Sequence, residues 1–171
     1  GDVLVGIEEQ SLLTKPFVNL LHFRKQWPDG VAYQAQEKLL VVAPMSGHYA
    51  TLLRGTVEGL LPHFDVYITD WADARNVPLA HGKFDLDDYT DYVIEMLQLL
   101  GPGTSVVAVC QPSVPVLAAV SLMSAAKDPA VPKAMVLMGG PIDTRRNPTA
   151  VNKLAEERGV DRQLAVFAVH D

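Results

Sequence analysis

Short apolar runs rich in β-branched residues alternate along the chain with longer segments whose apolar positions recur at the period of a helix. Such alternation is typical of a mostly parallel sheet with helices on its faces. The pattern therefore predicts an α/β fold, organised as a three-layer α/β/α sandwich. The expected strands are Leu4–Ile7, Phe17–Phe23, Leu39–Ala43, Val66–Thr69, Ser105–Val109, Ala134–Met138 and, with a less pronounced pattern, Leu164–Val169.

The first two expected strands have no helical segment between them. We therefore expect them to form an antiparallel lead-in to the parallel part of the sheet. The residues Trp27–Gly30, WPDG, are typical of a turn and would join the two parts.

The clearest helical period covers Leu86–Leu100, where the apolar residues fall on one stripe. Aspartates at its start suit the positive end of a helix, and Gly101-Pro102-Gly103 ends it. The segment Val114–Ala126 is apolar on nearly all sides, which predicts a buried helix. Further helices are expected at Ala50–Leu61 and Thr149–Arg158.

The composition narrows the class of protein. A chain of 171 residues, 49% of them hydrophobic, can bury one sizeable core, so we expect a single domain over residues 1–171. The formal net charge of −6 argues against a nucleic-acid partner. One cysteine excludes an internal disulfide, and the start of the chain lacks the pattern of a secretion signal, which favours a cytoplasmic location. No apolar run is long enough for a membrane span, and the histidines lack the spacing of metal ligands.

The single cysteine, Cys110, lies where an apolar strand passes directly into an apolar helix. Only a tight turn fits there, and small or compact residues, Ala108 and Pro112, stand two positions to either side. This arrangement resembles the nucleophile elbow G-x-S-x-G, with cysteine in place of serine. The backbone N–H groups of the helix would favour the thiolate. The alternative is a buried structural cysteine, because free cysteine often serves as a small hydrophobe.

The loop after the third strand, APMSGHYA, would open a helix at the same edge of the sheet. In an acyl-transfer enzyme such a loop supplies one N–H of an oxyanion hole, and the residue after the nucleophile, here Gln111, supplies the other. Met45 and Ser46 are the candidate donors, and His48 is a candidate substrate contact. An ordinary capped turn is the alternative for this loop. Asp70, at the end of the fourth strand, is interpreted as a turn and capping residue rather than a catalytic acid.

Four segments together resemble the intracellular poly(3-hydroxybutyrate) depolymerases of the α/β-hydrolase family: PFVNLLHF, VVAPMSGHYATLLRGTVEGLLPHFDVYITDW, VCQPSVPVLAAVSLM and LMGGPIDTRRNPT. The resemblance implies that Cys110 is the nucleophile and that Gln111 and the Met45–Ser46 stretch are oxyanion donors. It implies a carboxylic ester hydrolase that cleaves 3-hydroxybutyrate esters of cytoplasmic polyester granules through a thioester on the cysteine, without a metal or an organic cofactor.

The chain departs from that family pattern after the nucleophile. In α/β-hydrolases the acid and then the histidine follow the nucleophile, and here the only later histidine is His170, at the second-to-last position. A triad of Cys110, Asp143 and His170 has the right order, but a terminal residue is poorly held. We expect instead that the chain is incomplete at its C-terminus and inactive by itself. A carboxylesterase or thioesterase acting on another small ester, and a non-catalytic binding protein of the same fold, are the alternatives; the oligomeric state stays open.

Overall fold

The computed structural model describes residues 4–45, 50–150 and 152–157. They belong to two compact units, Gly1–Gly140 and Pro141–Asp171. The first unit contains the sheet and the three principal helices.

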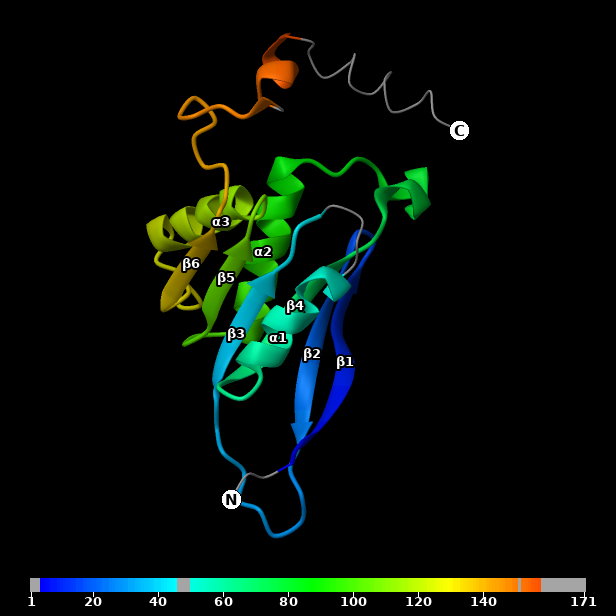
Figure 1. The fold of residues 1–171 in the computed structure, drawn as a ribbon, viewed down its shortest axis with the longest axis vertical. Helices are drawn as coiled ribbons and strands as arrows, with labels where there is room; N and C mark the ends of the chain where they lie inside the picture. Colours follow the sequence, from blue (N-terminus) through cyan, green and yellow to red (C-terminus); the bar gives the residue numbers. More distant parts are fainter. Residues whose placement is uncertain (1–3, 46–49, 151, 158–171) are drawn as a thin grey trace. The chain divides into compact units, whose positions relative to one another are not determined.

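Within the described residues, one sheet of six strands has the order β1-β2-β4-β3-β5-β6 (Figure 1). The strands β1 and β2 run antiparallel to each other, and β2 runs antiparallel to β4. The remaining neighbours, β3 with β4, β3 with β5 and β5 with β6, are parallel. The expected antiparallel lead-in to a parallel sheet is therefore confirmed. The strand bounds are β1 Gly6–Lys15, β2 Val18–Gln26, β3 Glu37–Val42, β4 Phe64–Trp71, β5 Ser105–Val109 and β6 Ala134–Met138.

The first hairpin is longer than its apolar pattern predicts. The strand expected at Leu4–Ile7 is in fact Gly6–Lys15, and its side chains are mostly exposed. Pairing with β2 maintains it across an irregularity between Ser11 and Leu13. A strand at the edge of a sheet needs no continuous apolar run, so its sequence carries only a faint signal. The turn at Trp27–Gly30 is present, with Val31 N–H donating to the carbonyl oxygen of Pro28 at 3.1 Å.

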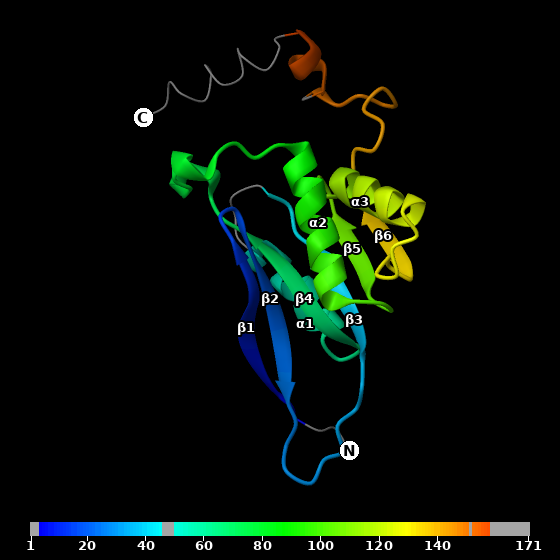
Figure 2. The ribbon, with the colours of Figure 1, turned by 180° about the vertical axis from the view of Figure 1, so that it is seen from behind.

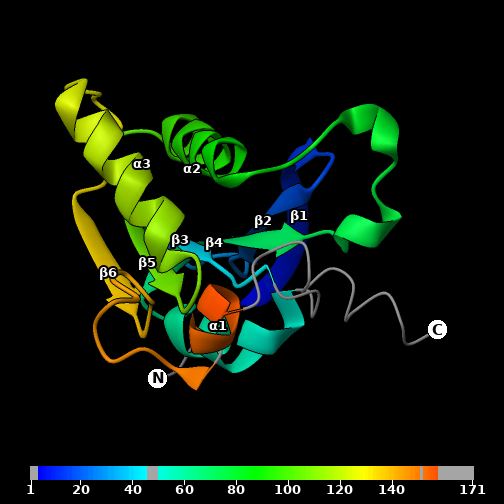
Figure 3. The same cartoon turned by 90° about the horizontal axis from the view of Figure 1, so that it is seen from above.

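The helices cover both faces of the sheet, which confirms the three-layer sandwich. Helices α2 and α3 lie on one face and α1 on the other (Figures 2 and 3). Helix α2 begins at a capping box, in which Asp85 and Asp88 each accept a hydrogen bond from the backbone N–H of the other. The helical bounds are η1 Ala50–Leu53, α1 Arg54–Leu60, η2 Ala74–Asn76, η3 Leu79–His81, α2 Leu86–Leu100 and α3 Ser113–Ala125.

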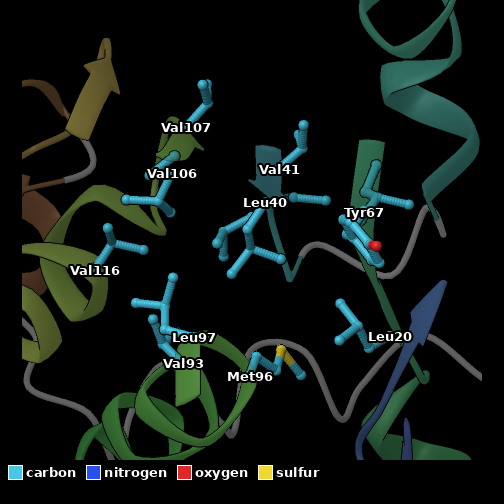
Figure 4. Close-up of a cluster of buried hydrophobic side chains, with 14 of the residues drawn as sticks. Leu20, Leu40, Val41, Tyr67, Val93, Met96, Leu97, Val106, Val107 and Val116 are labelled. Carbon is cyan, nitrogen blue, oxygen red and sulfur yellow. The ribbon is translucent and has the colours of Figure 1, made fainter. Parts of the chain in front are cut away.

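The main core lies between the sheet and α2. Leu40 of β3 and Val106 of β5 point toward Val93 and Leu97 of α2, whereas Val41 points toward the other face of the sheet (Figure 4). All five side chains are fully buried. Burial on both faces explains why the central strands read as continuous apolar runs instead of alternating ones.

Helix α3 corrects the expectation of a helix buried on all sides. It packs against α2 and β5, and Val116, Ala119 and Met123 are buried. However, Leu122 is 57% exposed. The apolar composition predicted burial, but the two neighbouring elements cover only part of the helix surface.

In the second unit, residues 152–157 are helical, as expected for this part of the chain. Thr149 caps them: its hydroxyl oxygen accepts from Asn152 N–H at 3.4 Å, and its own backbone N–H donates to Asn152 Oδ1 at 2.9 Å. The strand expected at Leu164–Val169 lies outside the described residues. Among the helices that the structure describes, none is both long and apolar enough to cross a bilayer.

Candidate active site

Cys110 occupies a sharp turn between β5 and α3. It follows the last residue of β5 directly, and its φ angle is 68°. A non-glycine residue in this left-handed region carries a steric cost of roughly 1–2 kcal/mol, so the surrounding structure has to enforce the conformation. The cysteine is exposed. The alternative of a cysteine sealed in the core is therefore wrong.

Two backbone hydrogen bonds and one close approach hold this elbow. Cys110 N–H donates to the carbonyl oxygen of Met138, the last residue of β6, at 2.7 Å, and the Cys110 carbonyl oxygen accepts from Ser113 N–H at 3.1 Å. Gly140, just past β6, lies so close that a Cβ there would stand 2.1 Å from the Cβ and Oγ of Ser113. The preceding Gly139 has a φ of 65°, which suits glycine. The segment after β6 thus packs directly on the turn that presents the thiol.

The residues two positions from the cysteine have the compactness that the elbow pattern requires. Ala108 is fully buried and lies opposite Val42 of β3. Pro112 is buried at the N-cap position of α3, where its fixed φ, here −58°, suits the start of a helix. Both side chains are buried, so a bulkier residue at either position would require its neighbours to shift.

The loop after β3 begins at a strand end that β4 holds firmly. Ala43 N–H donates to Thr69 Oγ1 at 2.9 Å, and the Ala43 carbonyl oxygen accepts from the indole N–H of Trp71 at 2.9 Å. Both partner side chains are buried. Trp71 anchors the start of this loop through this hydrogen bond. The sequence gives little indication that Thr69 accepts this hydrogen bond; it shows only a hydroxyl residue within an apolar strand.

The candidate oxyanion residues differ in how much the structure describes. Met45 is half-buried, two residues after the clamped Ala43. The strands β3 and β5 are parallel neighbours, with Val42 opposite Ala108. Met45 and Cys110 therefore follow the carboxyl ends of their strands, on the same side of the sheet. Ser46 and His48 lie outside the described residues.

Gln111 directly follows the nucleophile candidate and is exposed. Its carbonyl oxygen accepts from Val114 N–H at 3.3 Å, as in the first turn of a helix. In the part of the chain that the structure describes, its backbone N–H has no hydrogen-bond acceptor. The Gln111 N–H is therefore available to a ligand beside the thiol.

Asp70 lies inside β4, opposite Asn19 of β2, and not in a turn after the strand. Asp70 is therefore not in the expected turn, because pairing with β2 extends β4 to Trp71. Asp70 lines a cavity of about 660 Å³ between α1 and the outer strands.

A catalytic base is not identified among the described residues. None of their histidines is hydrogen bonded to Cys110. His22 Nε2 and Asp65 Oδ1 are 2.7 Å apart. However, Asp65 is at the start of β4, whereas Cys110 follows the carboxyl end of β5, so they are at opposite ends of the strands. His170 lies outside the described residues, and no group of three or more described His, Cys, Asp or Glu side chains could hold a metal ion.

Asp143, the acid of the internal triad weighed above, is engaged with Arg145. The guanidinium donates to both carboxylate oxygens, at 2.8 and 3.0 Å. These side-chain bonds, together with a backbone N–H, lower the pKa of Asp143. The ion pair with Arg145 supplies hydrogen bonds to both carboxylate oxygens of Asp143 without a histidine.

Sequence reasoning missed Gly139 and Gly140 as positioning residues of the elbow. The available signal was two successive glycines at the end of a strand, which indicates an unusual backbone angle or a close approach.

The sheet order, the strand directions and the elbow after β5 define an α/β-hydrolase-like fold. Comparison with solved structures gives the same result. Two similar structures are a variant of N-formylmaleamic acid deformylase from Pseudomonas putida S16, with TM-score 0.58 and 17% identity, and an esterase from Rhizomucor miehei, with TM-score 0.56 and 15% identity. A third is the type II thioesterase BorB of the borrelidin biosynthetic cluster, with TM-score 0.54 and 13% identity.

These structures cover 94%, 95% and 91% of this chain, respectively, whereas the chain spans only 62%, 53% and 61% of theirs. Identities this low establish the fold and leave the reaction open. No family model matches the chain. No curated protein sequence matches it either.

Proposed function

We propose that this chain carries the nucleophile of an α/β-hydrolase-type carboxylic ester hydrolase, and that Cys110 is that nucleophile. The observation that carries the proposal is an exposed thiol on a left-handed turn between a buried strand and a helix. Strained backbone of this kind persists only where neighbouring contacts enforce it, and such sites often serve chemistry. The fold of the esterase and thioesterase neighbours supports the hydrolase class.

The proposed reaction is acyl transfer in two steps. The thiolate of Cys110 attacks the ester carbonyl carbon, a C–S bond forms, and the carbonyl oxygen becomes an oxyanion. The N–H of Gln111 and one from the Met45–Ser46 stretch donate to this oxyanion. The C–O bond then breaks, and the alcohol leaves with the proton that the thiol lost. Water attacks the thioester and releases the acid, and the thiol regains a proton.

For the substrate we propose 3-hydroxybutyrate esters of an intracellular polyester, degraded on granules in the cytoplasm. The CQP sequence at the elbow supports this choice, since it is the nucleophile setting of the depolymerases that the chain resembles. We propose that the described strands form most of one hydrolase domain, and that the acid and base of the full-length protein are supplied by residues outside the described ones.

The test is ester hydrolysis by the full-length protein. Cys110→Ala should lower the turnover of p-nitrophenyl butyrate and of amorphous poly(3-hydroxybutyrate) by about 10³-fold or more, with the folded spectrum unchanged. Ser124→Ala, at an exposed position of α3, is the matched control and should retain full activity. Undiminished hydrolysis by the Cys110→Ala variant would refute the assignment. Activity on the small ester without activity on the polymer would refute only the polymer substrate and indicate a carboxylesterase.

A non-catalytic binding protein is the second candidate. The observation that favours it is the lack of a histidine bonded to the thiol among the described residues. Such a protein would bind an ester without turnover, so the hydrolysis assay separates the two candidates.

A further inference from the structure

The segment between β4 and α2 contains a run of four apolar residues, Val77–Ala80. Leu79, within this run, is 97% exposed, the highest exposure among the large apolar side chains that the structure describes. Pro78 and Ala80 are exposed as well, and Val77 is half-buried. Single exposed apolar residues are ordinary on a protein surface, whereas several in succession indicate a contact surface. The run is therefore a candidate docking surface.

Backbone hydrogen bonds fix the conformation of this run. It joins two short helical turns, η2 and η3. Val77 N–H donates to the carbonyl oxygen of Ala74 at 3.2 Å, and His81 N–H donates to that of Pro78 at 3.0 Å. Leu79 is thus presented to solvent by a formed turn.

Aromatic residues hold both ends of the loop that carries the run. Trp71, the last residue of β4, and Phe84, just before α2, have ring centroids 5.9 Å apart. Phe84 also stacks on Phe17, with centroids 4.7 Å apart. Both Trp71 and Phe17 are buried. Loops whose ends lie close together on a packed base are often functional. This loop has a fixed base in the core and an apolar tip in solvent.

The apolar tip is on the same side of the sheet as Cys110. The loop follows the carboxyl end of β4, and Cys110 follows the carboxyl end of β5. Both strands are parallel to β3, so the two carboxyl ends lie at the same end of the sheet. Figures 1 and 2 show the green segment before α2 projecting from that end. A surface that receives the tip would therefore lie at the end of the sheet that presents the thiol.

The charges beside the tip are largely paired within the loop. The run itself contains no ionisable residue. On one side, the guanidinium of Arg75 donates to the two carboxylate oxygens of Asp73, at 3.2 and 2.8 Å. On the other side, Lys83 Nζ donates to Asp85 Oδ2 at 2.9 Å, and His81 is the remaining ionisable residue of the loop. An uncharged apolar surface suits this tip better than an anionic lipid surface, which the net charge of −6 also disfavours.

We propose that this tip, Pro78–Ala80, docks on the surface of an apolar polyester particle, with Leu79 inserted among the polymer chains. The inference rests on the proposed function, which supplies the polymer, and adds to it the residues that hold the protein on the particle. Transfer of an exposed leucine side chain out of water is favourable. A preformed loop also loses little conformational entropy when it docks. Docking at this end of the sheet brings the thiol of Cys110 toward the ester groups of the surface.

The test is co-sedimentation with amorphous poly(3-hydroxybutyrate) particles. The full-length Cys110→Ala protein is used, so that turnover does not alter the surface. In that background Leu79→Ser should lower the partition coefficient about tenfold or more, because it removes the side chain that leaves water. Its urea midpoint should be unchanged, because Leu79 is almost fully exposed. Leu99→Ser is the matched control: this leucine is 50% exposed, at the end of α2 away from the loop, and its replacement should leave binding unaltered.

Leu79→Trp gives a direct readout of insertion. Its indole emission should shift to shorter wavelength when particles are added, whereas the emission of Trp27 and Trp71 in the parent protein should change far less. Unaltered binding of Leu79→Ser, an equal loss in Leu99→Ser, or a Leu79→Trp emission that particles leave unchanged would overturn the proposal. Preferential binding to anionic phospholipid vesicles that high salt abolishes would also overturn it, because that result indicates an electrostatic contact.

Hydrolysis and docking are measured separately. Binding that depends on Leu79, in a protein that hydrolyses no ester, would refute the function proposed for Cys110 and leave the docking surface in place. Ester hydrolysis by the original protein, with particle binding that does not depend on Leu79, would refute the docking surface alone.

Discussion

Replacing Gly140 by alanine would place a methyl group directly on the nucleophile elbow. The added Cβ would lie 2.1 Å from the Cβ and Oγ of Ser113 and 2.9 Å from the carbonyl oxygen of Cys110. Contacts of real Cβ atoms are essentially never shorter than 3.0 Å. Ser113 is fully buried, and its Cβ is fixed by the helix backbone, so a change of rotamer cannot relieve the clash. We expect the free energy of unfolding to fall by about 1–3 kcal/mol, as for other overpacked sites.

Urea unfolding, followed by circular dichroism, measures the loss. Gly55→Ala is the matched control: it lies within α1, and a Cβ there would have no heavy atom within 4 Å. Because alanine is the better helix former, that variant should gain about 0.5–1 kcal/mol. The rate of alkylation of Cys110 by iodoacetamide should change in the Gly140→Ala variant only, because only that clash displaces the turn.

A double-mutant cycle tests the contact itself. Ser113→Gly removes the Cβ and Oγ that the new methyl group meets, so the double variant should lose less stability than the sum of the two single variants. Strict additivity, or a Gly140→Ala protein as stable as the original, would refute the reasoning that the segment after β6 packs on the elbow.

Three further substitutions test other parts of the site and fold. Thr69→Val removes the buried acceptor of Ala43 N–H and should lower the free energy of unfolding, measured with urea, by about 1–3 kcal/mol. An unchanged urea midpoint would show that this hydrogen bond does not hold the loop after β3. Cys110→Gly should be about 1 kcal/mol more stable than Cys110→Ala, because glycine relieves the left-handed turn; equal stabilities would show that the turn is unstrained. The pKa of Asp85 is lowered, chiefly by the side-chain hydrogen bond from Lys83. The charged Asp85 therefore stabilises the folded protein above the pKa of the unfolded state, about 3.9, and this stabilisation is lost as the pH falls through the lower pKa of the folded state. The urea midpoints of the original protein and of Asp85→Asn should converge only in acid. Convergence at neutral pH would contradict this.

The central elements were predictable because local signals and tertiary burial agree there. Helix α2 and strands β5 and β6 occur at the expected residues. In α2 the amphipathic stripe, the aspartate cap and the terminal glycine all indicate the same bounds. In β5 the strand is buried between two layers, so its apolar run matches its length.

The outer elements were harder to predict, because partners distant in the sequence determine them. Strand β1 exists through its ladder with β2, and its residues Glu8 and Glu9 are exposed charges that no apolar pattern reveals. The exposure of Leu122 on α3 depends on which neighbours cover the helix, and composition does not carry that information.

For the candidate site, the sequence was sufficient to find the turn at Cys110 but not the contacts that hold it. The strand-to-helix junction with compact residues on either side indicated the elbow. The bond from Cys110 to Met138, and the clamp of Thr69 and Trp71 on Ala43, join strands that are far apart in the sequence. Such contacts depend on sheet order and register, which become visible only in the folded chain.

The most direct test of Cys110 as the nucleophile is to trap its acyl form. The full-length protein is mixed with p-nitrophenyl butyrate, quenched in acid during turnover, and digested for peptide mass analysis. We predict a butyryl adduct on the peptide that contains Cys110, removable by neutral hydroxylamine and absent from the Cys110→Ala variant. Turnover with an adduct on another residue, or with this peptide unmodified throughout, would contradict the account.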